Sequence, residues 1–256
     1  MPANALARLA ERSHLLLCLD YDGTLSEIVA EPSLAFPVPG IRETVLRLAA
    51  VSSRLTVAIV TGRSIAEARR LLGLNRGLVF SGLHGLEAAR PDGAGAVAPA
   101  ALACKPELDR VRDWLACNVP SQQGFRIEDK GFALGLHYRA AEPSIARMLV
   151  EDFAQFVTAN APGLKLMRLK MLLEAIPRAA SKAHAVAALR DLVTTPHATA
   201  FIGDDVTDED AFAALGPGDL GILVGPARPS RARYRLPSPA AVAVALKALA
   251  DYFDNH

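Results

Sequence analysis

Short apolar runs recur near both ends of the chain, and each of them ends in small or polar residues. They are LLLCLD at 15–20, LTVAIVTG at 55–62, GLVFSG at 77–82, ATAFIGDD at 198–205 and GILVG at 221–225. The runs are continuously apolar rather than alternating, which is typical of strands that are buried on both faces of a parallel sheet. The pattern therefore predicts a parallel sheet built from both ends of the chain.

Helical patterns lie between these runs. They cover 40–50, 64–72, 181–193 and 207–215. Ser64 and Glu67 form a capping-box pattern at the start of the second helix, and Ser181 and Thr207 are predicted N-caps of the last two. Strands that alternate with helices predict a doubly wound α/β fold.

The middle of the chain has a different pattern. We expect helices at 105–118 and 142–160, strands at 125–128 and 132–139 around a turn at 129–131, and one or two strands within 164–176. This α+β block is predicted to be an insertion at 106–177 within a core formed by 1–105 and 178–256. The length of 256 residues fits one large domain with a smaller insertion, at about 150 residues per domain. The Ala-, Gly- and Pro-rich piece at 90–103 is predicted to be a loop or hairpin.

Composition narrows the function classes. Lys and Arg total 28 and Asp and Glu total 27, so the net charge of +1 gives no basic excess for nucleic acid. The three cysteines lack metal-type spacing, and we expect reduced thiols in a cytoplasmic protein. No apolar run approaches the roughly 20 residues of a membrane span. We also expect a monomer without membrane or nucleic-acid partners.

Polar residues follow the apolar runs at the carboxyl ends of the predicted strands, where ligands bind in such sheets. The first run leads into Asp20 and Asp22, two carboxylates on the same side of an extended chain, and then into Gly23, which allows a sharp turn. The second leads into Thr61-Gly62-Arg63 and a helix N-terminus that can receive an anion.

Five carboxylates follow the fourth run within seven residues. They are Asp204, Asp205, Asp208, Glu209 and Asp210. A hard divalent cation such as Mg²⁺ would relieve their repulsion and leave coordination positions for phosphate. Acids are also common at helix N-termini, so the last three remain open to that simpler interpretation.

Lys182 follows Ser181 in the first turn of a predicted helix, where a cation opposes the helix dipole. Taken alone, this position predicts an exposed surface lysine. Beside an acidic phosphate site, however, a lysine balances the charge of nucleophile and phosphate.

Four elements in this order resemble the motifs of the haloacid dehalogenase-like phosphohydrolases. They are Asp20-Tyr21-Asp22-Gly23-Thr24-Leu25, Thr61, Lys182 and Gly203-Asp204-Asp205-Val206-Thr207-Asp208. The resemblance implies that Asp20 is a nucleophile that forms an aspartyl-phosphate. Asp22 would then act as general acid and afterwards as general base.

The same resemblance implies a Mg²⁺ site and a phosphate site. The metal ligands would be Asp20, the main-chain carbonyl of Asp22, and Asp204, with Asp205 and Asp208 in support. Phosphoryl oxygens would be held by Thr61 and Lys182, and Gly23, Gly62 and Arg63 would contact substrate.

Further segments are similar to the trehalose-6-phosphate phosphatases. They include Ser26-Glu27-Ile28, Gly82-Leu83-His84-Gly85-Leu86-Glu87, Glu128-Asp129-Lys130-Gly131, Leu136-His137-Tyr138-Arg139 and the tail from Gly221 to Pro239. The resemblance spans about residues 15–250. It implies Mg²⁺-dependent hydrolysis of trehalose 6-phosphate, the last step of trehalose biosynthesis, with the insertion acting as a lid.

Strand alternation places Arg126, Glu128 and Lys130 on one face of the insertion, and Arg168, Lys170 and Glu174 share a parity on a later strand. A mixed-charge face suits sugar hydroxyls, which need donors and acceptors. Together with the resemblance, this predicts substrate contacts from Glu128, Lys130 and Glu174. A structural role is at least as well supported for His84 and His137.

Two positions depart from the family pattern: Ile176 stands where a basic residue is usual, and Ala183 where Gly is usual. The sugar preference therefore stays open to a sucrose-phosphate or mannosyl-phosphoglycerate phosphatase. A response-regulator receiver also combines clustered Asp, Thr and Lys, but it is about half this size and has no insertion. A catalytically dead sugar-phosphate sensor is disfavoured by the intact Asp20 and Asp22.

Overall fold

The computed structural model describes residues 2–12 and 14–255, which fall into two compact units. The first unit combines the chain up to Ala96 with the chain from Ser181 onward, and the second is Val97–Ala180. The limits predicted for the insertion, 106–177, lie inside the second unit. This unit begins earlier, at Val97, and includes Cys104, whose Sγ atom lies 3.6 Å from the carbonyl oxygen of Gly163.

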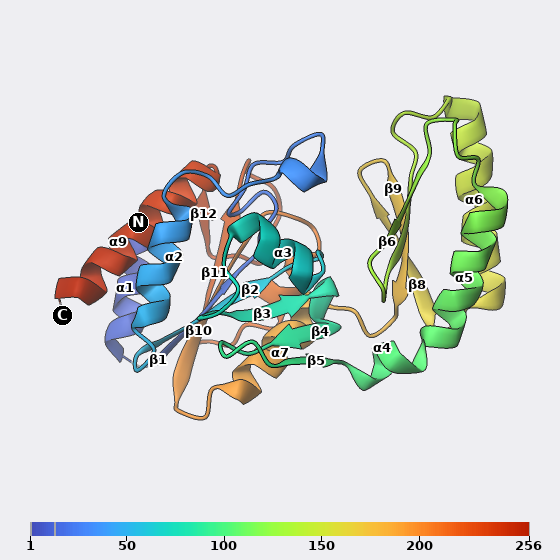
Figure 1. Cartoon of the computed structure of the whole chain (residues 1–256). Coiled ribbons are helices and arrows are strands. Elements are labelled where there is room, and N and C mark those ends of the chain that lie inside the picture. Colours follow the sequence, from blue (N-terminus) through green and yellow to red (C-terminus); the bar gives the residue numbers. More distant parts are fainter. Residues whose placement is uncertain (1, 13, 256) are drawn as a thin grey trace. The chain divides into compact units, whose positions relative to one another are not determined.

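The first unit is built on one sheet (Figure 1). In spatial order its described strands are β12 (Tyr234–Leu236), β11 (Leu220–Val224), β10 (His197–Gly203), β1 (His14–Leu19), β2 (Leu55–Val60), β3 (Val79–Gly82), β4 (Glu87–Ala89) and β5 (Gly95–Val97). Neighbours from β12 to β3 are parallel, and β4 is antiparallel to β3. The predicted parallel sheet is confirmed.

Helices cover both faces of this sheet, as a doubly wound fold requires. One face carries α1 (Pro2–Arg12), α2 (Ile41–Ala50), α3 (Ile65–Leu72) and α9 (Pro239–Asn255), and the other carries α7 (Lys182–Leu192) and α8 (Asp208–Ala213). Within β1, Leu15 and Leu17 belong to the first core, while Leu16 and Cys18 belong to the second. Both faces of the strand are buried, which explains its unbroken apolar sequence.

The second unit is a four-stranded antiparallel sheet with helices on one face. Its elements are α4 (Pro99–Ala103), α5 (Lys105–Asn118), β6 (Arg126–Asp129), β7 (Leu134–His137), α6 (Pro143–Asn160), β8 (Leu164–Leu169) and β9 (Leu172–Pro177), with strand order β6-β7-β9-β8. Leu134, Leu136 and Leu173 face a core that includes Phe153, on which Trp114 stacks with a ring-centroid distance of 5.6 Å. The other face of the sheet carries polar side chains.

Helix starts largely follow the predicted caps. Ser64 Oγ accepts a hydrogen bond from the main-chain N–H of Glu67 (3.3 Å), and Ser181 Oγ accepts from Ala183 (3.1 Å). Thr207 occupies the predicted N-cap position of α8, but its side chain makes no capping hydrogen bond. The carboxylate of Asp208, the first residue of α8, accepts a hydrogen bond from the main-chain N–H of Asp205.

The segment 90–103 was predicted to be a loop or hairpin, and only its first part is one. Strands β4 and β5 are neighbours in the sheet, but Pro99–Ala103 is helical. Short 3₁₀ turns occur at η1 (Pro32–Leu34) and η2 (Leu83–Gly85). Within 2–12 and 14–255, no helix is long and apolar enough to cross a membrane.

Candidate active site

The carboxyl ends of three adjacent strands bring the candidate site residues together. Strand β1 lies between β10 and β2, with Leu19 level with Ile202 on one side and Ile59 on the other. Asp20 directly follows β1, and its main-chain N–H donates to the carbonyl of Ile202 at 2.9 Å. The loops that carry Asp204 and Thr61 leave β10 and β2 at the same edge, as a parallel register requires.

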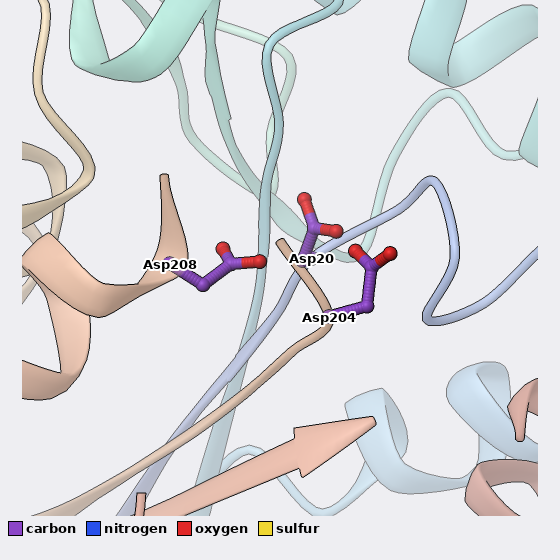
Figure 2. Close-up of side chains that lie close together, drawn as sticks. All are labelled: Asp20, Asp204 and Asp208. Atoms are coloured by element: carbon purple, nitrogen blue, oxygen red, sulfur yellow. The ribbon is translucent and has the colours of Figure 1, made fainter. Parts of the chain in front are cut away.

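Three aspartates form a compact cluster at this edge (Figure 2). Asp20, Asp204 and Asp208 each offer a carboxylate oxygen, and these oxygens all lie within 4.8 Å of one another. Gly23 permits the arrangement: it has a φ of +71°, and a Cβ atom there would lie 2.0 Å from Asp204 Oδ2. Any larger residue at position 23 would therefore displace the Asp204 carboxylate.

Lys182 supplies a buried cation beside the cluster. Its Nζ donates to Asp20 Oδ1 at 2.7 Å and to Asp208 Oδ1 at 2.6 Å, and the lysine is only 3% exposed. Burial alone would lower the pKa of Lys182, but the two carboxylates raise it well above its ordinary value, so the ammonium stays charged. The alternative of an exposed surface lysine is wrong.

The carboxylates of the cluster repel one another in a buried environment. Burial raises the pKa of Asp204 to about 7, and the charge of Asp208 adds to that rise. The pKa of Asp20 is also raised by burial, against the attraction of Lys182. Hard carboxylate oxygens this close together fit a divalent cation such as Mg²⁺, which would compensate the excess negative charge. The residues present therefore suit a divalent metal ion.

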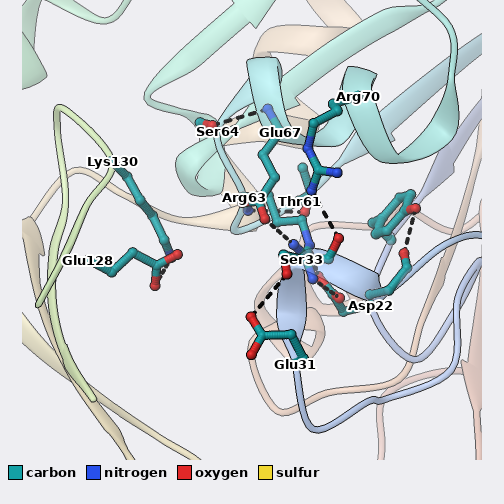
Figure 3. Close-up of polar contacts among 12 residues, drawn as sticks. Asp22, Glu31, Ser33, Thr61, Arg63, Ser64, Glu67, Arg70, Glu128 and Lys130 are labelled. Carbon is teal, nitrogen blue, oxygen red and sulfur yellow. Dashed lines mark hydrogen bonds and ion pairs between the residues drawn. The ribbon is translucent and has the colours of Figure 1, made fainter. Parts of the chain in front are cut away.

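Asp22 and Arg63 form a separate ion pair next to the cluster (Figure 3). Arg63 Nε and Nη2 donate to the two carboxylate oxygens of Asp22 at 2.7 Å each, and Nη1 donates to Glu67 at 2.5 Å. Arg63 was predicted to contact substrate, and in the structure this fork holds its side chain on Asp22. Sequence spacing alone gave no sign of this pairing.

Asp205 was predicted to support the metal site. Its side chain is exposed and is not one of the three clustered carboxylates. Its main-chain N–H donates to Asp208 Oδ2 at 2.9 Å, which orients the buried carboxylate. The predicted Thr61 is 1% exposed, and its Oγ1 accepts from the main-chain N–H of Arg63 at 3.1 Å.

One residue near the site had no signal in the sequence. The Nη2 atom of Arg228 donates to the main-chain carbonyls of Asp204 (3.2 Å) and Asp205 (2.8 Å), and its Nη1 pairs with Glu209 at 2.7 Å. Arg228 therefore holds in place the loop that carries Asp204 and Asp205. It lies in an Arg-rich stretch in which no pattern distinguishes it from its exposed neighbours.

The second unit has its own polar cluster on the sheet face opposite the helices. Glu128, Gly135 and Glu174 are cross-strand partners, and Lys130 Nζ lies 2.7 Å from Glu174 Oε1 and 3.8 Å from Glu128 Oε2 (Figure 3 draws the latter pair). Glu174 is 1% exposed, and its Oε2 has no hydrogen-bond partner among the described residues. A buried carboxylate oxygen with spare capacity is suited to accept a hydrogen bond from a ligand.

His137 donates to this cluster. Its Nε2 lies 2.8 Å from Glu128 Oε2, and because a carboxylate only accepts, Nε2 carries the proton. Burial pushes the pKa of Glu128 upward, but His137 and Lys130 hold it down at about 2. The expectation that Arg168 shares a face with Glu174 was wrong: the turn after β8 changes the parity, and Arg168 lies opposite Leu173.

The sequence model described as trehalose-phosphatase matches residues 18–240, which includes every motif at the three strand ends. The chain belongs to the trehalose-phosphatase family. Proteins named trehalose-phosphate phosphatase from Mycobacterium marinum and Mycobacterium avium are similar, with 35% identity over 235 residues and 32% over 256.

These alignments cover 88% and 94% of this chain but 58% and 63% of the two relatives, so the chain spans about three fifths of their length. Solved structures agree on the fold of the family. The C. albicans trehalose-6-phosphate phosphatase C-terminal domain has a TM-score of 0.80 at 24% identity, covering 98% of this chain and 97% of that one. An Aspergillus fumigatus trehalose-6-phosphate phosphatase has a TM-score of 0.70 at 27% identity, covering 98% of both chains.

Proposed function

We propose that this protein is a Mg²⁺-dependent phosphatase that hydrolyses trehalose 6-phosphate to trehalose and inorganic phosphate. Family membership and the names of its relatives support the substrate. One observation of the structure carries the chemistry: Lys182 bridges Asp20 and Asp208 at the carboxyl edge of a parallel sheet. This arrangement provides a nucleophile, a fixed cation and oxygen ligands for a metal within a few ångströms.

In the proposed reaction an oxygen of Asp20 attacks phosphorus, and the bond from phosphorus to the sugar oxygen breaks. This step forms an aspartyl-phosphate, and the departing sugar oxygen takes a proton from Asp22. Asp22 then accepts a proton from water, whose oxygen attacks phosphorus and releases phosphate from Asp20. Lys182 and Thr61 hold phosphoryl oxygens throughout, so most of the rate enhancement comes from positioning and charge.

The fork from Arg63 to Asp22 adds a requirement to this scheme. Both carboxylate oxygens of Asp22 accept hydrogen bonds from Arg63, so at least one of them must be released before Asp22 can transfer a proton to the leaving group. We assign Arg63 to holding the general acid–base in place rather than to binding phosphate. Glu67 in turn orients Arg63.

The proposed Mg²⁺ ligands are Asp20, Asp204 and the main-chain carbonyl of Asp22, supported by Asp208 and Asp205. When bound, the metal would neutralise charge on the phosphoryl group and on the carboxylates. The raised pKa of Asp204, which reflects buried carboxylates close together, supports a cation at this position.

Sugar recognition is proposed for the polar face of the second unit. Glu128 and Glu174 offer acceptors and Lys130 a donor, which together match the needs of sugar hydroxyls. The free Oε2 of Glu174 among the described residues supports this assignment. Ile176, which replaces a usually basic residue, is fully buried in β9 and offers no polar group to a sugar.

A substrate panel tests the proposal. Phosphate release is measured from trehalose 6-phosphate, sucrose 6-phosphate, mannosyl-phosphoglycerate and p-nitrophenyl phosphate, with Mg²⁺ or with EDTA. We expect trehalose 6-phosphate to have the highest kcat/KM, and EDTA to abolish turnover. Better turnover of another sugar phosphate would transfer the assignment to that sugar, and full activity in EDTA would remove the metal.

Variants separate the chemistry from sugar recognition. We expect Asp20→Asn to abolish turnover of every substrate while the fold persists by circular dichroism. Glu174→Gln should raise KM for trehalose 6-phosphate and leave p-nitrophenyl phosphate hydrolysis nearly unchanged. Asp152→Asn, at an exposed position on α6, is the matched control and should behave as wild type.

A further inference from the structure

A strained turn follows β3 and lies beside the loop 61–63 after β2. Leu83 and His84 have φ values of +47° and +54°, a left-handed conformation that non-glycine residues seldom adopt, and two of them occur in succession. Both residues are buried. Strained backbone of this kind persists only where the surrounding structure determines it, and it is concentrated at functional sites.

The turn is bonded to the loop after β2. The main-chain N–H of Leu83 donates to the carbonyl of Arg63 at 2.9 Å, and that of His84 donates to the carbonyl of Thr61 at 3.0 Å. The imidazole of His84 packs on Gly62, where a Cβ atom would lie 2.6 Å from Nε2. Thr61, Gly62 and Arg63, the three residues of this loop, are therefore all contacted by two residues of the turn.

The same turn is bonded to the start of α7. The main-chain N–H of Ser181 donates to the carbonyl of His84 at 2.7 Å. Gly85 approaches this helix so closely that a Cβ atom would lie 3.2 Å from both Ser181 O and Ala185 N. Ser181 is the N-cap of α7, and Lys182 is its first residue. One peptide segment thus connects Thr61 to the helix that presents Lys182.

We propose that His84 is a positioning residue: its left-handed backbone sets the separation between Thr61 and Lys182. The inference rests on the proposed function, in which these two side chains hold the phosphoryl oxygens. In this role His84 acts through its two main-chain hydrogen bonds, to Thr61 and from Ser181. Histidine suits the position because it adopts the left-handed region more readily than most residues, and its ring fills the space above Gly62.

Two substitutions at one position test the backbone role. Asn tolerates the left-handed conformation, whereas Val resists it because of its β-branch. For His84→Val we expect kcat to fall about 100-fold on both p-nitrophenyl phosphate and trehalose 6-phosphate, since a displacement of about 1 Å can cost that much. Inhibition by vanadate, which mimics the phosphoryl group in the transition state, should weaken in parallel. His84→Asn should keep most of the wild-type kcat and most of the vanadate inhibition.

His197→Val is the matched control, because it makes the same change at the first residue of β10, a strand position that suits Val. It should leave kcat and vanadate inhibition at wild-type values. If His84→Val does not fold by circular dichroism, Gly85→Ala replaces it, since its Cβ pushes on α7 directly, and the same loss of kcat and vanadate affinity is expected.

Three results would overturn the inference. In one, His84→Val keeps wild-type kcat and vanadate inhibition. In another, it loses only thermal stability while the folded enzyme keeps both constants, which indicates a purely structural turn. In the third, His84→Asn is as impaired as His84→Val, which assigns the effect to the imidazole rather than the backbone. Failure of the proposed function has a different signature, because the wild-type protein itself would then release no phosphate from any substrate.

Discussion

Replacing Lys182 with methionine removes one charge from the centre of the site and keeps most of the side-chain volume. In the wild-type protein the ammonium lies 2.7 Å from Asp20 and 2.6 Å from Asp208, and all three residues are less than 5% exposed. The variant leaves two buried carboxylates without their cation, next to a third from Asp204.

The expected cost follows from that geometry. Removing one partner of a buried ion pair typically destabilises a protein by about 3–5 kcal/mol, because the remaining charge stays buried and uncompensated. Lys182 serves two carboxylates, so we expect the upper part of this range. With a urea m-value of about 2 kcal/mol/M, the midpoint of unfolding should fall by about 2 M. A loss of this size is a large share of the 5–15 kcal/mol that typically stabilises a native protein.

Urea unfolding in EDTA, followed by far-UV circular dichroism, measures the effect without metal compensation. Lys247→Met is the matched control, since Lys247 is 64% exposed and forms a surface pair with Asp251. Its free energy of unfolding should change by less than about 1 kcal/mol. The double variant Lys182→Met/Asp208→Asn should regain at least about 1 kcal/mol over the single variant, because one of the two stranded charges is gone.

Two outcomes would refute the reasoning. One is a Lys182→Met variant within about 1 kcal/mol of wild type, which would show that the carboxylates are neutral or solvated in the free protein. The other is a double variant that is less stable than Lys182→Met, which would mean that Asp208 contributes through its hydrogen bond with Asp205 rather than through its charge.

Three further predictions concern other charges. The pKa of Glu128 is held at about 2, so ionised Glu128 stabilises the folded state above about pH 4.5, and this contribution is lost as the pH falls to 2. In Glu128→Gln the free energy of unfolding should therefore fall less steeply with acid, by up to about 3 kcal/mol. Fluorescence of Trp114, in the same unit, measures the unfolding. Mg²⁺ at 100 times its Kd should stabilise the wild type by about 2.7 kcal/mol in a thermal-shift assay and Asp204→Asn far less, and equal shifts would place the cation elsewhere. Arg63→Lys keeps the charge but not the fork on Asp22, so kcat should fall at least 10-fold with little change in KM, and an unchanged kcat would remove the positioning role.

Patterns with one strong physical cause were predictable from the sequence. Strand β1 was expected at 15–20 and is found at His14–Leu19, because burial on both faces imposes an unbroken apolar run. The meeting of Asp20 with Asp204 followed from parallel strands that end at one edge. The helix cap of Ser181 followed from its position before a periodic pattern.

Contacts that depend on side-chain direction were not predictable. The fork between Arg63 and Asp22 joins residues 41 positions apart, and no periodicity encodes it. Arg168 was assigned to the wrong face because a two-residue turn, Lys170 and Met171, separates β8 from β9; Met171 has a φ of +61°. The left-handed turn at His84 was not predictable either, because its conformation is imposed by hydrogen bonds to residues distant in the sequence.

The central pair of the large sheet has a consequence for the order in which the chain folds during synthesis. Strand β1 pairs with β10, and His14 is level with His197. Residues up to His197 must therefore leave the ribosome before this pairing can close, whereas Val97–Ala180 is contiguous and is complete earlier. Closing so long a loop costs about 4–5 kcal/mol of chain entropy, counting only the length-dependent part. Until then the nascent amino-terminal strands, which are apolar on both faces, lack their central neighbour, and their unpaired edges are exposed to aggregation.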